Sequence, residues 1–356
     1  MRVQRPSLIT GGAGFIGCNL ADRLACGGER VLVLDNLSRP GVAANAEWLR
    51  LRHPDLIEVI VADVRDRGAV SDAVSRCRAV FHLAAQVAVT TSLIDPGYDL
   101  EVNVLGTFAL LDVLRQRAPE APLVFASTNK VYGDLEDVEL ADTGEGWMPR
   151  HPALRARGFN EQRPLDFRTP YGCSKGAADQ YVLDYARSLG LRSAVLRMSC
   201  IYGPRQLGTE DQGWVAHFLL RSLADETIVL YGDGRQVRDI LRVEDATSAY
   251  IAARDRIEAI SGSAFNLGGG PANAVCLLAL IDYVSELLGR RVAVEHAPWR
   301  PHDQRYFVAD TRRVRAALGL GAPIGWRTGV ADLLRRFADP RADDALPRAG
   351  LRAAGA

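Results

Sequence analysis

Short apolar runs alternate with longer amphipathic stretches along most of the chain. The apolar runs lie at residues 31–35, 56–61, 79–83, 122–127, 193–198 and 263–267. Nearly continuous apolar runs of this length are typical of strands buried on both faces, and most of the stretches between them have helical periodicity. The alternation predicts an α/β fold, a Rossmann-like doubly wound parallel sheet covered by helices on both faces.

The pattern changes after residue 200, where apolar segments become shorter and glycine-rich breaks more frequent. We expect residues 1–199 to form mainly the Rossmann-like domain. Residues 200–337 should form mainly a smaller, interleaved C-terminal substrate lobe, with a strand near 263–267 that returns to the large sheet.

Two segments lack clear periodicity. Residues 134–169 form a long polar insertion, and such a loop inside a compact domain is more often a functional cover than filler. We expect it to cover the substrate and to be partly mobile. Residues 338–356 are rich in Ala, Arg, Asp and Pro, which predicts a disordered tail.

Composition narrows the class of protein. The 356 residues are 48% hydrophobic and 24% charged, and their formal net charge is zero. Such a chain can bury a large core, and without a basic block it offers no electrostatic site for nucleic acid or an anionic membrane. Its apolar runs fall well short of the roughly twenty residues that cross a membrane. We therefore expect a cytoplasmic protein without nucleic-acid or membrane partners.

The six cysteines are scattered and include no Cys-x-x-Cys pair. They are Cys18, Cys26, Cys77, Cys173, Cys200 and Cys276. Without a histidine at metal-ligand spacing, they predict small reduced core residues and no metal site. Cys173 and Cys200 differ only in that both lie in segments expected at the active site.

The first apolar run, residues 7–10, leads into Gly11-Gly12-Ala13-Gly14-Phe15-Ile16-Gly17 and then an amphipathic stretch. Strand, glycine turn and helix in this order are typical of a dinucleotide site. Gly11 permits the tight turn, Gly14 lets backbone N–H groups approach a pyrophosphate, and Gly17 lets the helix pack closely on the strand.

Asp35 ends the next predicted strand, about twenty residues beyond the glycines. A carboxylate at this position can accept both hydroxyls of the adenosine ribose and would repel a 2′-phosphate. The sequence therefore predicts NAD rather than NADP, although Arg39 lies near enough to weaken that preference.

Of the 43 basic residues, only Lys130 and Lys175 are lysines. Lys175 follows Tyr171 by four residues, which places both on one face of a helix. An ammonium beside a phenol lowers the phenol pKa from about 10, so that tyrosine can act as an acid or base near neutral pH. A guanidinium cannot replace that compact ammonium. Taken alone, an exposed pair without function fits the spacing equally well.

Small and polar residues follow the ends of further predicted strands: Asp63 and Val64, then Leu83, Ala84, Ala85 and Gln86, then Ser127, Thr128 and Asn129. Ligands of doubly wound sheets bind beyond the carboxyl ends of the strands. We expect these strand ends to meet at one crevice.

Taken together, the glycine turn, Thr128, Tyr171 and Lys175 resemble the extended short-chain dehydrogenase/reductases that act on nucleotide sugars. The resemblance covers residues 7–335. It implies that Thr128 hydrogen-bonds the reacting hydroxyl, Tyr171 takes and returns its proton, and Lys175 holds the nicotinamide ribose. The NAD site that it implies comprises Gly11, Gly14, Phe15, Ile16, Gly17, Asp35, Asn36, Ser38, Asp63, Val64, Leu83, Ala84, Ala85, Gln86, Asn103, Ser127, Tyr171, Lys175 and Ser199.

The residues after Thr128 separate the reactions of this superfamily. The nucleotide-sugar 4,6-dehydratases that the chain resembles have an Asp-Glu pair there and the decarboxylases a Glu, whereas this chain has Asn129 and Lys130. Elimination of water needs an acid and a base besides the tyrosine, so an amide and an ammonium argue against dehydration. Transient oxidation followed by re-reduction on the opposite face, which is epimerisation, is the leading chemistry.

Longer segments are similar to the CDP-tyvelose 2-epimerases, which interconvert CDP-paratose and CDP-tyvelose. They are residues 127–135, 165–167, 170–181, 211–215 and 303–305. This resemblance implies epimerisation at C2 of a CDP-3,6-dideoxyhexose. The substrate residues that it implies are Gln86, Thr128, Asn129, Cys200, Arg205, Arg238, Arg300 and Asp303.

Two features of that site are less certain from sequence. Arg238 and Arg300 would grip diphosphate oxygens, but surface ion pairing is the alternative for them. Cys200 stands where the superfamily commonly has Asn and the tyvelose subfamily a small hydroxyl residue. Because a thiol is the weaker hydrogen bonder, a different sugar or nucleotide stays open.

Two other functions also stay open. A 4-epimerase of a UDP- or GDP-sugar would share every catalytic residue, and a non-catalytic NAD-binding protein would be expected to lose at least one of them. The family resemblance further implies a homodimer formed through helices near 100–117 and 171–189. Leu100, Val104, Phe108 and Leu111 would form its apolar stripe, for which a core-facing role is equally compatible.

Overall fold

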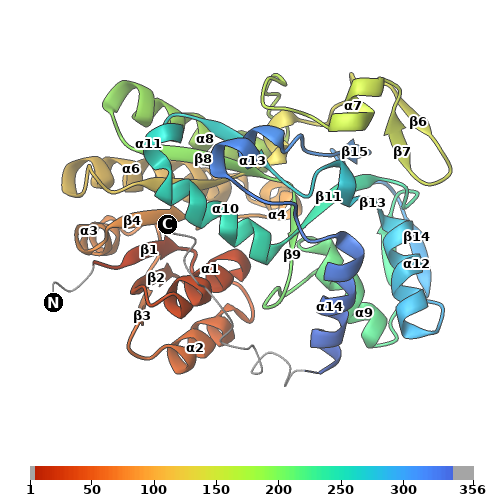
Figure 1. Cartoon of the computed structure of the whole chain (residues 1–356), viewed down its shortest axis with the longest axis horizontal. Coiled ribbons are helices and arrows are strands. Elements are labelled where there is room, and N and C mark those ends of the chain that lie inside the picture. Colours follow the sequence, from red (N-terminus) through yellow and green to blue (C-terminus); the bar gives the residue numbers. More distant parts are fainter. Residues whose placement is uncertain (1–4, 340–356) are drawn as a thin grey trace.

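The computed structural model describes residues 5–339, and a seven-stranded parallel sheet forms its centre (Figure 1). The strand order is β12 (Ala264–Leu267), β8 (Ser193–Met198), β5 (Leu123–Thr128), β4 (Ala79–His82), β1 (Ser7–Thr10), β2 (Val31–Asp35) and β3 (Ile57–Val61). The strands coincide with the predicted apolar runs to within one residue. The predicted doubly wound α/β fold is confirmed.

Consecutive residues of the central strands face two different cores, which explains why these strands are mostly apolar. Leu8 and Val80 pack into a cluster with helices α3 (Arg67–Arg76), α6 (Gly106–Arg117) and α8 (Thr169–Leu189). Ile9 and Phe81 pack on the other face against α1 (Phe15–Cys26), α2 (Val42–Arg52), α10 (Val243–Asp255) and α13 (Arg312–Leu318). A charged residue at either kind of position would therefore be buried without water.

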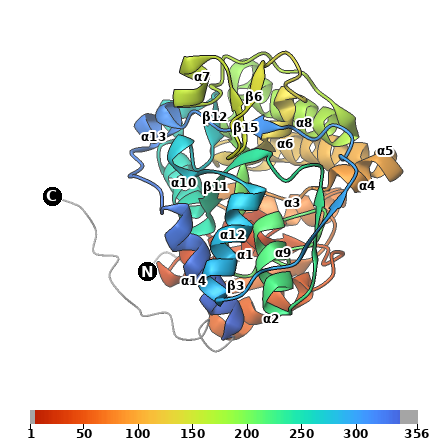
Figure 2. The same ribbon diagram turned by 90° about the vertical axis from the view of Figure 1, so that its right-hand side faces the viewer.

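A second group of elements, mostly from the C-terminal part of the chain, forms a smaller lobe. Its strands are β9 (Cys200–Tyr202), β11 (Val237–Arg242), β13 (Ala274–Cys276) and β15 (Tyr306–Phe307) in one sheet, and β10 (Ile228–Tyr231) paired with β14 (Val294–Ala297). Helices α9 (Trp214–Leu223), α12 (Leu277–Leu288) and α14 (Trp326–Ala338) lie side by side around their own apolar cluster (Figure 2).

The two lobes are interleaved, because α10, the short helix α11 (Ile257–Ile260) and β12 come late in the chain. β12 pairs in parallel with β8 at the edge of the large sheet. The proposed domain boundaries themselves stay a prediction.

The insertion at 134–169 contains structure that its weak periodicity did not predict. It holds an antiparallel hairpin, β6 (Leu140–Asp142) and β7 (Trp147–Pro149), and helix α7 (Pro152–Arg157). Strands of three residues are too short to show a period. Phe159 anchors the segment by stacking on Phe307 of the smaller lobe, with ring centroids 5.5 Å apart.

A long helical run precedes β5 and changes type along its length. It comprises α4 (Val89–Ile94), α5 (Pro96–Asp99), a π-helix (Leu100–Leu105) and α6. The wider π turn rotates the side chains that follow it. The residues of the predicted apolar stripe therefore do not share one face. Leu100 and Phe108 are exposed, whereas Leu111 is fully buried in the core.

The predicted tail and the membrane prediction can be compared with the structure only within residues 5–339. Helix α14 ends at Ala338, and the rest of the predicted disordered tail, from residue 340, lies outside them. Across residues 5–339, no helix combines the length and apolar character needed to cross a membrane.

Candidate functional site

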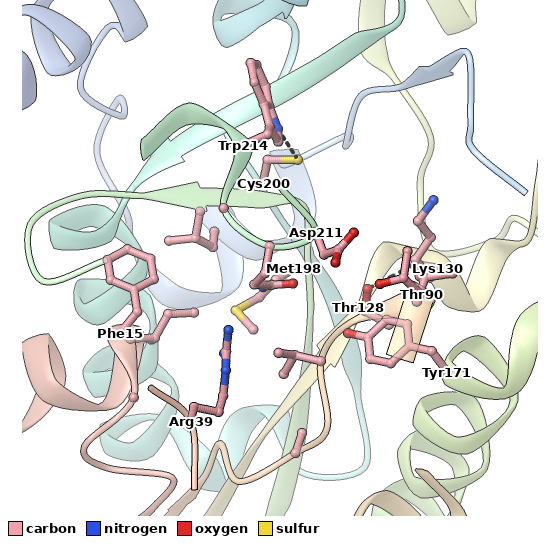
Figure 3. A pocket seen from close by; sticks show the side chains of 18 of the residues that line it. Phe15, Arg39, Thr90, Thr128, Lys130, Tyr171, Met198, Cys200, Asp211 and Trp214 are labelled. Atoms are coloured by element: carbon pink, nitrogen blue, oxygen red, sulfur yellow. Dashed lines mark hydrogen bonds between the residues drawn. The ribbon is translucent and has the colours of Figure 1, made fainter. Parts of the chain in front are cut away.

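A cavity of about 500 Å³ lies beyond the carboxyl ends of the parallel strands, where the large sheet meets the smaller lobe (Figure 3). It brings together most of the residues predicted to form the site. Those that line it are Gly11, Gly14, Phe15, Ile16, Gly17, Asp35, Asn36, Ser38, Asp63, Val64, Leu83, Ala84, Ala85, Ser127, Thr128, Asn129, Tyr171, Lys175, Ser199, Cys200, Arg238, Arg300 and Asp303.

Three predicted residues are not among those that line the cavity. Asn103 accepts a hydrogen bond from the backbone N–H of Gln86 at 2.9 Å and donates one to Ser174 Oγ at 2.9 Å. Gln86 itself donates to the backbone oxygen of Ala88 at 2.8 Å. Both therefore brace the wall beside α8. Arg205 lies over the Trp48 ring, 3.9 Å from its centroid.

The glycine turn leaves no room for side chains. Gly11 has a φ of +68°, and a Cβ there would lie 2.6 Å from Ala84 N. A Cβ on Gly17 would lie 2.4 Å from Gly11 O. Helix α1 begins directly after Gly14, so the N–H groups of its first turn face the cavity without a side-chain cap. This cradle fits the pyrophosphate of a dinucleotide.

Asp35 places a carboxylate at the neighbouring strand end. Its Oδ2 accepts from Ala13 N at 3.1 Å and its Oδ1 from Leu37 N at 2.9 Å, and these bonds hold the carboxylate at the edge of the cavity. Burial raises the pKa of Asp35, and these backbone hydrogen bonds oppose the rise. Arg39 also points into the cavity (Figure 3), where burial lowers its pKa and the charge of Asp35 opposes that shift.

The three predicted catalytic residues meet on the opposite wall. Thr128 ends β5, and Tyr171 and Lys175 come from the first two turns of α8. The Tyr171 phenol is hydrogen-bonded to Thr128, beside which it lies in Figure 3. Burial raises the pKa of Tyr171 to about 12, although the Thr128 hydrogen bond lowers it.

The expected effect of Lys175 on that phenol is wrong for this structure. Burial raises the phenol pKa, and the charge of Asp99 raises it further, whereas Lys175 does not measurably lower it. The charged groups that act on Lys175 itself are Asp179 and Asp99. Lys175 Nζ lies over the Phe125 ring, 4.2 Å from its centroid. Burial lowers the pKa of Lys175 to about 7.

A buried ion pair that the sequence analysis missed holds β5, α8 and β8 together. Arg197 donates to both carboxylate oxygens of Asp179, each at 2.9 Å, and Ser127 Oγ donates to Asp179 Oδ2 at 2.8 Å. Because Ser127 precedes Thr128 and Asp179 lies one turn after Lys175, the network fixes the catalytic residues relative to one another. An arginine inside the apolar run 193–198 was the available signal.

Polar contacts close the substrate side of the cavity. Asn129 Nδ2 donates to Gln304 Oε1 at 3.0 Å, and Arg238 Nη2 donates to Asp303 Oδ1 at 2.8 Å. Lys130 Nζ lies 3.9 Å from the same Asp303 oxygen. A loop from the smaller lobe is thereby tied to the residues that follow Thr128.

The predicted residues Cys200 and Arg300 have aromatic neighbours. Trp214 Nε1 donates to Cys200 Sγ at 3.4 Å, the dashed contact in Figure 3, and burial raises the pKa of that thiol. Arg300 lies 3.9 Å from the centroid of the Tyr231 ring and pairs with Asp211 at 3.3 Å. Lining residues that the sequence analysis did not assign include Arg39, Thr90, Lys130, Asp211, Trp214, Tyr231 and His302.

The cysteines differ from the expectation of a uniform core role. Cys26 and Cys173 are exposed and Cys200 is half-buried. Cys26 also has a histidine companion, since His53 Nε2 lies 4.0 Å from its sulfur and 2.7 Å from Asp22 Oδ1. Arg52 donates to the same Asp22 oxygen at 2.7 Å, so this carboxylate already has two partners. The chain fold, not sequence spacing, brings the group together.

Comparisons with known proteins agree with this geometry. Residues 7–268 match the NAD dependent epimerase/dehydratase family. The chain belongs to this family. The CDP-paratose 2-epimerase of Salmonella typhi is 40% identical over 91% of this chain and 96% of its own length. The UDP-glucose 4-epimerase of Mycolicibacterium smegmatis is 31% identical over 93% of this chain and 98% of its own.

Solved structures carry the same likeness. The UDP-glucose 4-epimerase of Thermus thermophilus in complex with NAD matches with a TM-score of 0.77 and 31% identity, over 94% of this chain and 99% of that one. The predicted family and the predicted cofactor, NAD, are confirmed. The protein is an NAD-dependent enzyme, and the glycine cradle and Asp35 are the residues that fit its cofactor.

Proposed function

We propose that the protein epimerises a nucleotide-linked hexose by transient oxidation and re-reduction, at C2 of a CDP-3,6-dideoxyhexose. The observation that carries the proposal is the Thr128–Tyr171 pair with Asn129 and Lys130, not carboxylates, on its substrate side. The acidic groups farther along that wall are engaged, Asp303 by Arg238 and Asp211 by Arg300. Dehydration, which needs a free acid and base, is disfavoured.

In this reaction Tyr171, Thr128 and Lys175 have separate roles. Bound NAD supplies a reversible hydride acceptor. Tyr171 takes the proton of the reacting hydroxyl and later returns it, and Thr128 donates a hydrogen bond to the oxygen as charge develops. Removal of one such donor costs about 2.7–4 kcal/mol in other enzymes. Lys175, buried beneath Tyr171 on the same helix face, supplies the ammonium that holds the nicotinamide ribose.

The choice of carbon and nucleotide rests on similarity over nearly the whole chain. The 40% identity to a CDP-paratose 2-epimerase supports C2 of a CDP-sugar. Part of the segments similar to that subfamily lines the cavity, including Asn129, Asp211 and Asp303. Cys200, held by Trp214, is the departure that leaves room for a related sugar.

A second candidate is epimerisation at C4 of a UDP- or GDP-sugar. It is favoured by the 31% identity to a UDP-glucose 4-epimerase, and it would use the same Thr128, Tyr171 and Lys175. The two candidates differ in which carbon of the sugar faces the nicotinamide. A non-catalytic NAD-binding role is disfavoured, because all three residues lie together in the cavity.

Proton NMR of the purified protein with CDP-paratose, without added cofactor, tests the proposal. We expect inversion at C2, sustained by NAD that copurifies with the protein. Inversion at C4 of a UDP- or GDP-hexose, with CDP-paratose unchanged, would establish the second candidate instead. Absence of inversion across CDP-, UDP- and GDP-hexoses, in protein shown to carry NAD, would contradict both.

Tyr171→Phe provides the matched catalytic control. The substitution removes only the hydroxyl, so the fold and the NAD content should be retained while kcat falls by roughly 10²–10⁴, the range typical of a lost acid–base group. Circular dichroism, cofactor content and the NMR assay measure the three quantities. A variant with undiminished turnover would remove Tyr171 from the reaction.

A further inference from the structure

The chain contains two lysines, Lys130 and Lys175. The epimerisation described above assigns a role to Lys175 but none to Lys130. It lies in the 3₁₀ turn Asn129–Tyr132 directly after β5 and lines the same cavity as Lys175. The other basic residues among the 43 are arginines. Because arginine serves equally well as surface charge, two lysines that line one cavity indicate two positions that require a compact ammonium.

The backbone places Lys130 next to the reacting group. Thr128 Oγ accepts a hydrogen bond from the backbone N–H of Lys130 at 3.2 Å, and the same threonine is hydrogen-bonded to Tyr171. The Lys130 side chain then points away from the Tyr171 ring (Figure 3). Its ammonium therefore lines the cavity without competing with Tyr171 for the reacting hydroxyl.

The ammonium has hydrogen-bonding capacity that the protein does not use. Within residues 5–339, Asp303 is the one acidic residue with an oxygen within 4.0 Å of Lys130 Nζ, and its distance of 3.9 Å exceeds that of a hydrogen bond. Arg238 Nη2 already holds that oxygen at 2.8 Å. The Lys130 side chain is only 23% exposed, and burial lowers its pKa. The N–H donors of the ammonium that Asp303 does not engage are therefore available to a ligand oxygen in the cavity.

We propose that Lys130 donates a hydrogen bond to a hydroxyl of the bound hexose other than the one that is oxidised. The inference rests on the proposed function. A 3,6-dideoxyhexose in its six-membered ring, linked to the nucleotide at C1, has free hydroxyls at C2 and C4 only. With C2 reacting, Lys130 contacts the C4 hydroxyl. It thereby determines specificity, and it retains the oxidised sugar while that sugar presents its other face.

This contact can be tested by a thermodynamic cycle in which Lys130 of the enzyme and the C4 hydroxyl of the substrate are removed separately and together. Wild type and Lys130→Met are each assayed with the CDP-3,6-dideoxyhexose and with its 4-deoxy analogue. We expect either change alone to lower kcat/KM by roughly tenfold to a hundredfold, as for a hydrogen bond to a charged group. Both changes together should cost little more than one, because they remove the same interaction. Losses that multiply would overturn the contact.

Two further readouts separate this role from a structural one. Lys130→Met should accumulate reduced nicotinamide during turnover, seen in the near-ultraviolet absorbance, because a poorly held ketosugar escapes before re-reduction. Its affinity for CDP, which lacks the hexose, should equal that of wild type by calorimetry. An equal loss of CDP affinity would assign Lys130 to the Asp303 ion pair instead.

Controls keep the outcomes distinct. Retained NAD content and melting temperature verify the fold of Lys130→Met, and Lys130→Arg, which keeps the charge, should recover only part of the activity because its fork is larger. Full recovery of activity in Lys130→Arg would show that the position requires only a positive charge, and it would overturn the specific contact.

Wild-type inactivity with the CDP-3,6-dideoxyhexose would refute the substrate and the C4 contact together. Wild-type activity with multiplying losses would refute Lys130 alone.

Discussion

At the scale of single residues, burial acts on the two catalytic titrating groups in opposite directions. It raises the pKa of Tyr171 to about 12 and lowers that of Lys175 to about 7. Both shifts favour the neutral form, because a charge in a poorly solvated site is costly. The carboxylates of Asp179 and Asp99 offset part of this cost for Lys175, which is why an ammonium is tolerated beside the Phe125 ring.

The pKa of Lys175 predicts how stability of the cofactor-free protein depends on pH. The unfolded-state value is about 10.4, above the folded value, so the unfolded chain binds the extra proton between about pH 7 and pH 10. The cost of burying the ammonium is present in full below pH 7 and disappears as pH rises through this window. We expect the free energy of unfolding, measured in urea, to rise with pH there.

Lys175→Met isolates the contribution of that residue. Burial also lowers the pKa of Lys130, so some rise with pH should remain in the variant. Tyr171 acts in a different window, because its raised pKa makes stability fall above about pH 10. Equal slopes for wild type and Lys175→Met between pH 7 and pH 10 would contradict the assignment.

The preference for NAD over NADP should depend on Asp35. In Asp35→Ser the acceptor pair for the ribose hydroxyls is lost, so NAD affinity should fall about tenfold or more. Arg39, which shares the cavity, could then bind a 2′-phosphate without a competing carboxylate, and NADP affinity should rise. Fluorescence titration of cofactor-stripped protein measures both. Adding Arg39→Ala should abolish the gain, and unchanged selectivity in Asp35→Ser would exclude this role.

At the scale of elements, the sequence predicts best those strands and turns whose positions depend on local burial or local sterics. The strands are found because both faces are buried, and the α1 turn because its glycines have no steric alternative. The hairpin at 140–149 and the π-helix at 100–105 were not predicted, since one is too short for a period and the other is a local shift of register. Contacts between distant residues, such as Asn129 with Gln304, have no local signal.

The same distinction explains which parts of the site could be predicted. The cradle and the catalytic residues lie in short motifs, whereas Asp303, which faces Lys130, and Asp99, which acts on Lys175, come from other elements. The pKa of Tyr171 was expected to fall because spacing shows that Lys175 is near but does not show how deeply both are buried. Desolvation is a property of the assembled fold.

Gly17→Ala tests the turn that positions the cofactor. The added Cβ would lie 2.4 Å from Gly11 O and 2.6 Å from Gly12 Cα, so the backbone of the cradle must move. Overpacking of this kind costs roughly 1–3 kcal/mol, and NAD affinity should fall together with the melting temperature. Gly321→Ala is the matched control, because no atom lies within 4 Å of its Cβ position. Similar behaviour of the two variants would contradict the steric argument.

At the scale of the whole molecule, large apolar side chains are exposed on the π-helix, α6 and α8. Leu100 is 52% exposed, and Tyr181 of α8 is 44% exposed and contacts the Phe108 ring, with centroids 5.8 Å apart. Exposed apolar side chains that gather on one face are typical of interaction surfaces. Because α8 also carries Tyr171 and Lys175, a partner on this face would brace the catalytic helix.

We expect this face to form the homodimer that the family resemblance implies. Leu100→Asp would bury a carboxylate at the interface and should shift the protein towards monomer at micromolar concentration, measured by light scattering. Leu51→Asp is the control, since Leu51 is 74% exposed on α2, which covers the opposite face of the sheet. It should leave the molar mass unchanged. A monomeric wild type, or equal effects of the two substitutions, would exclude this interface.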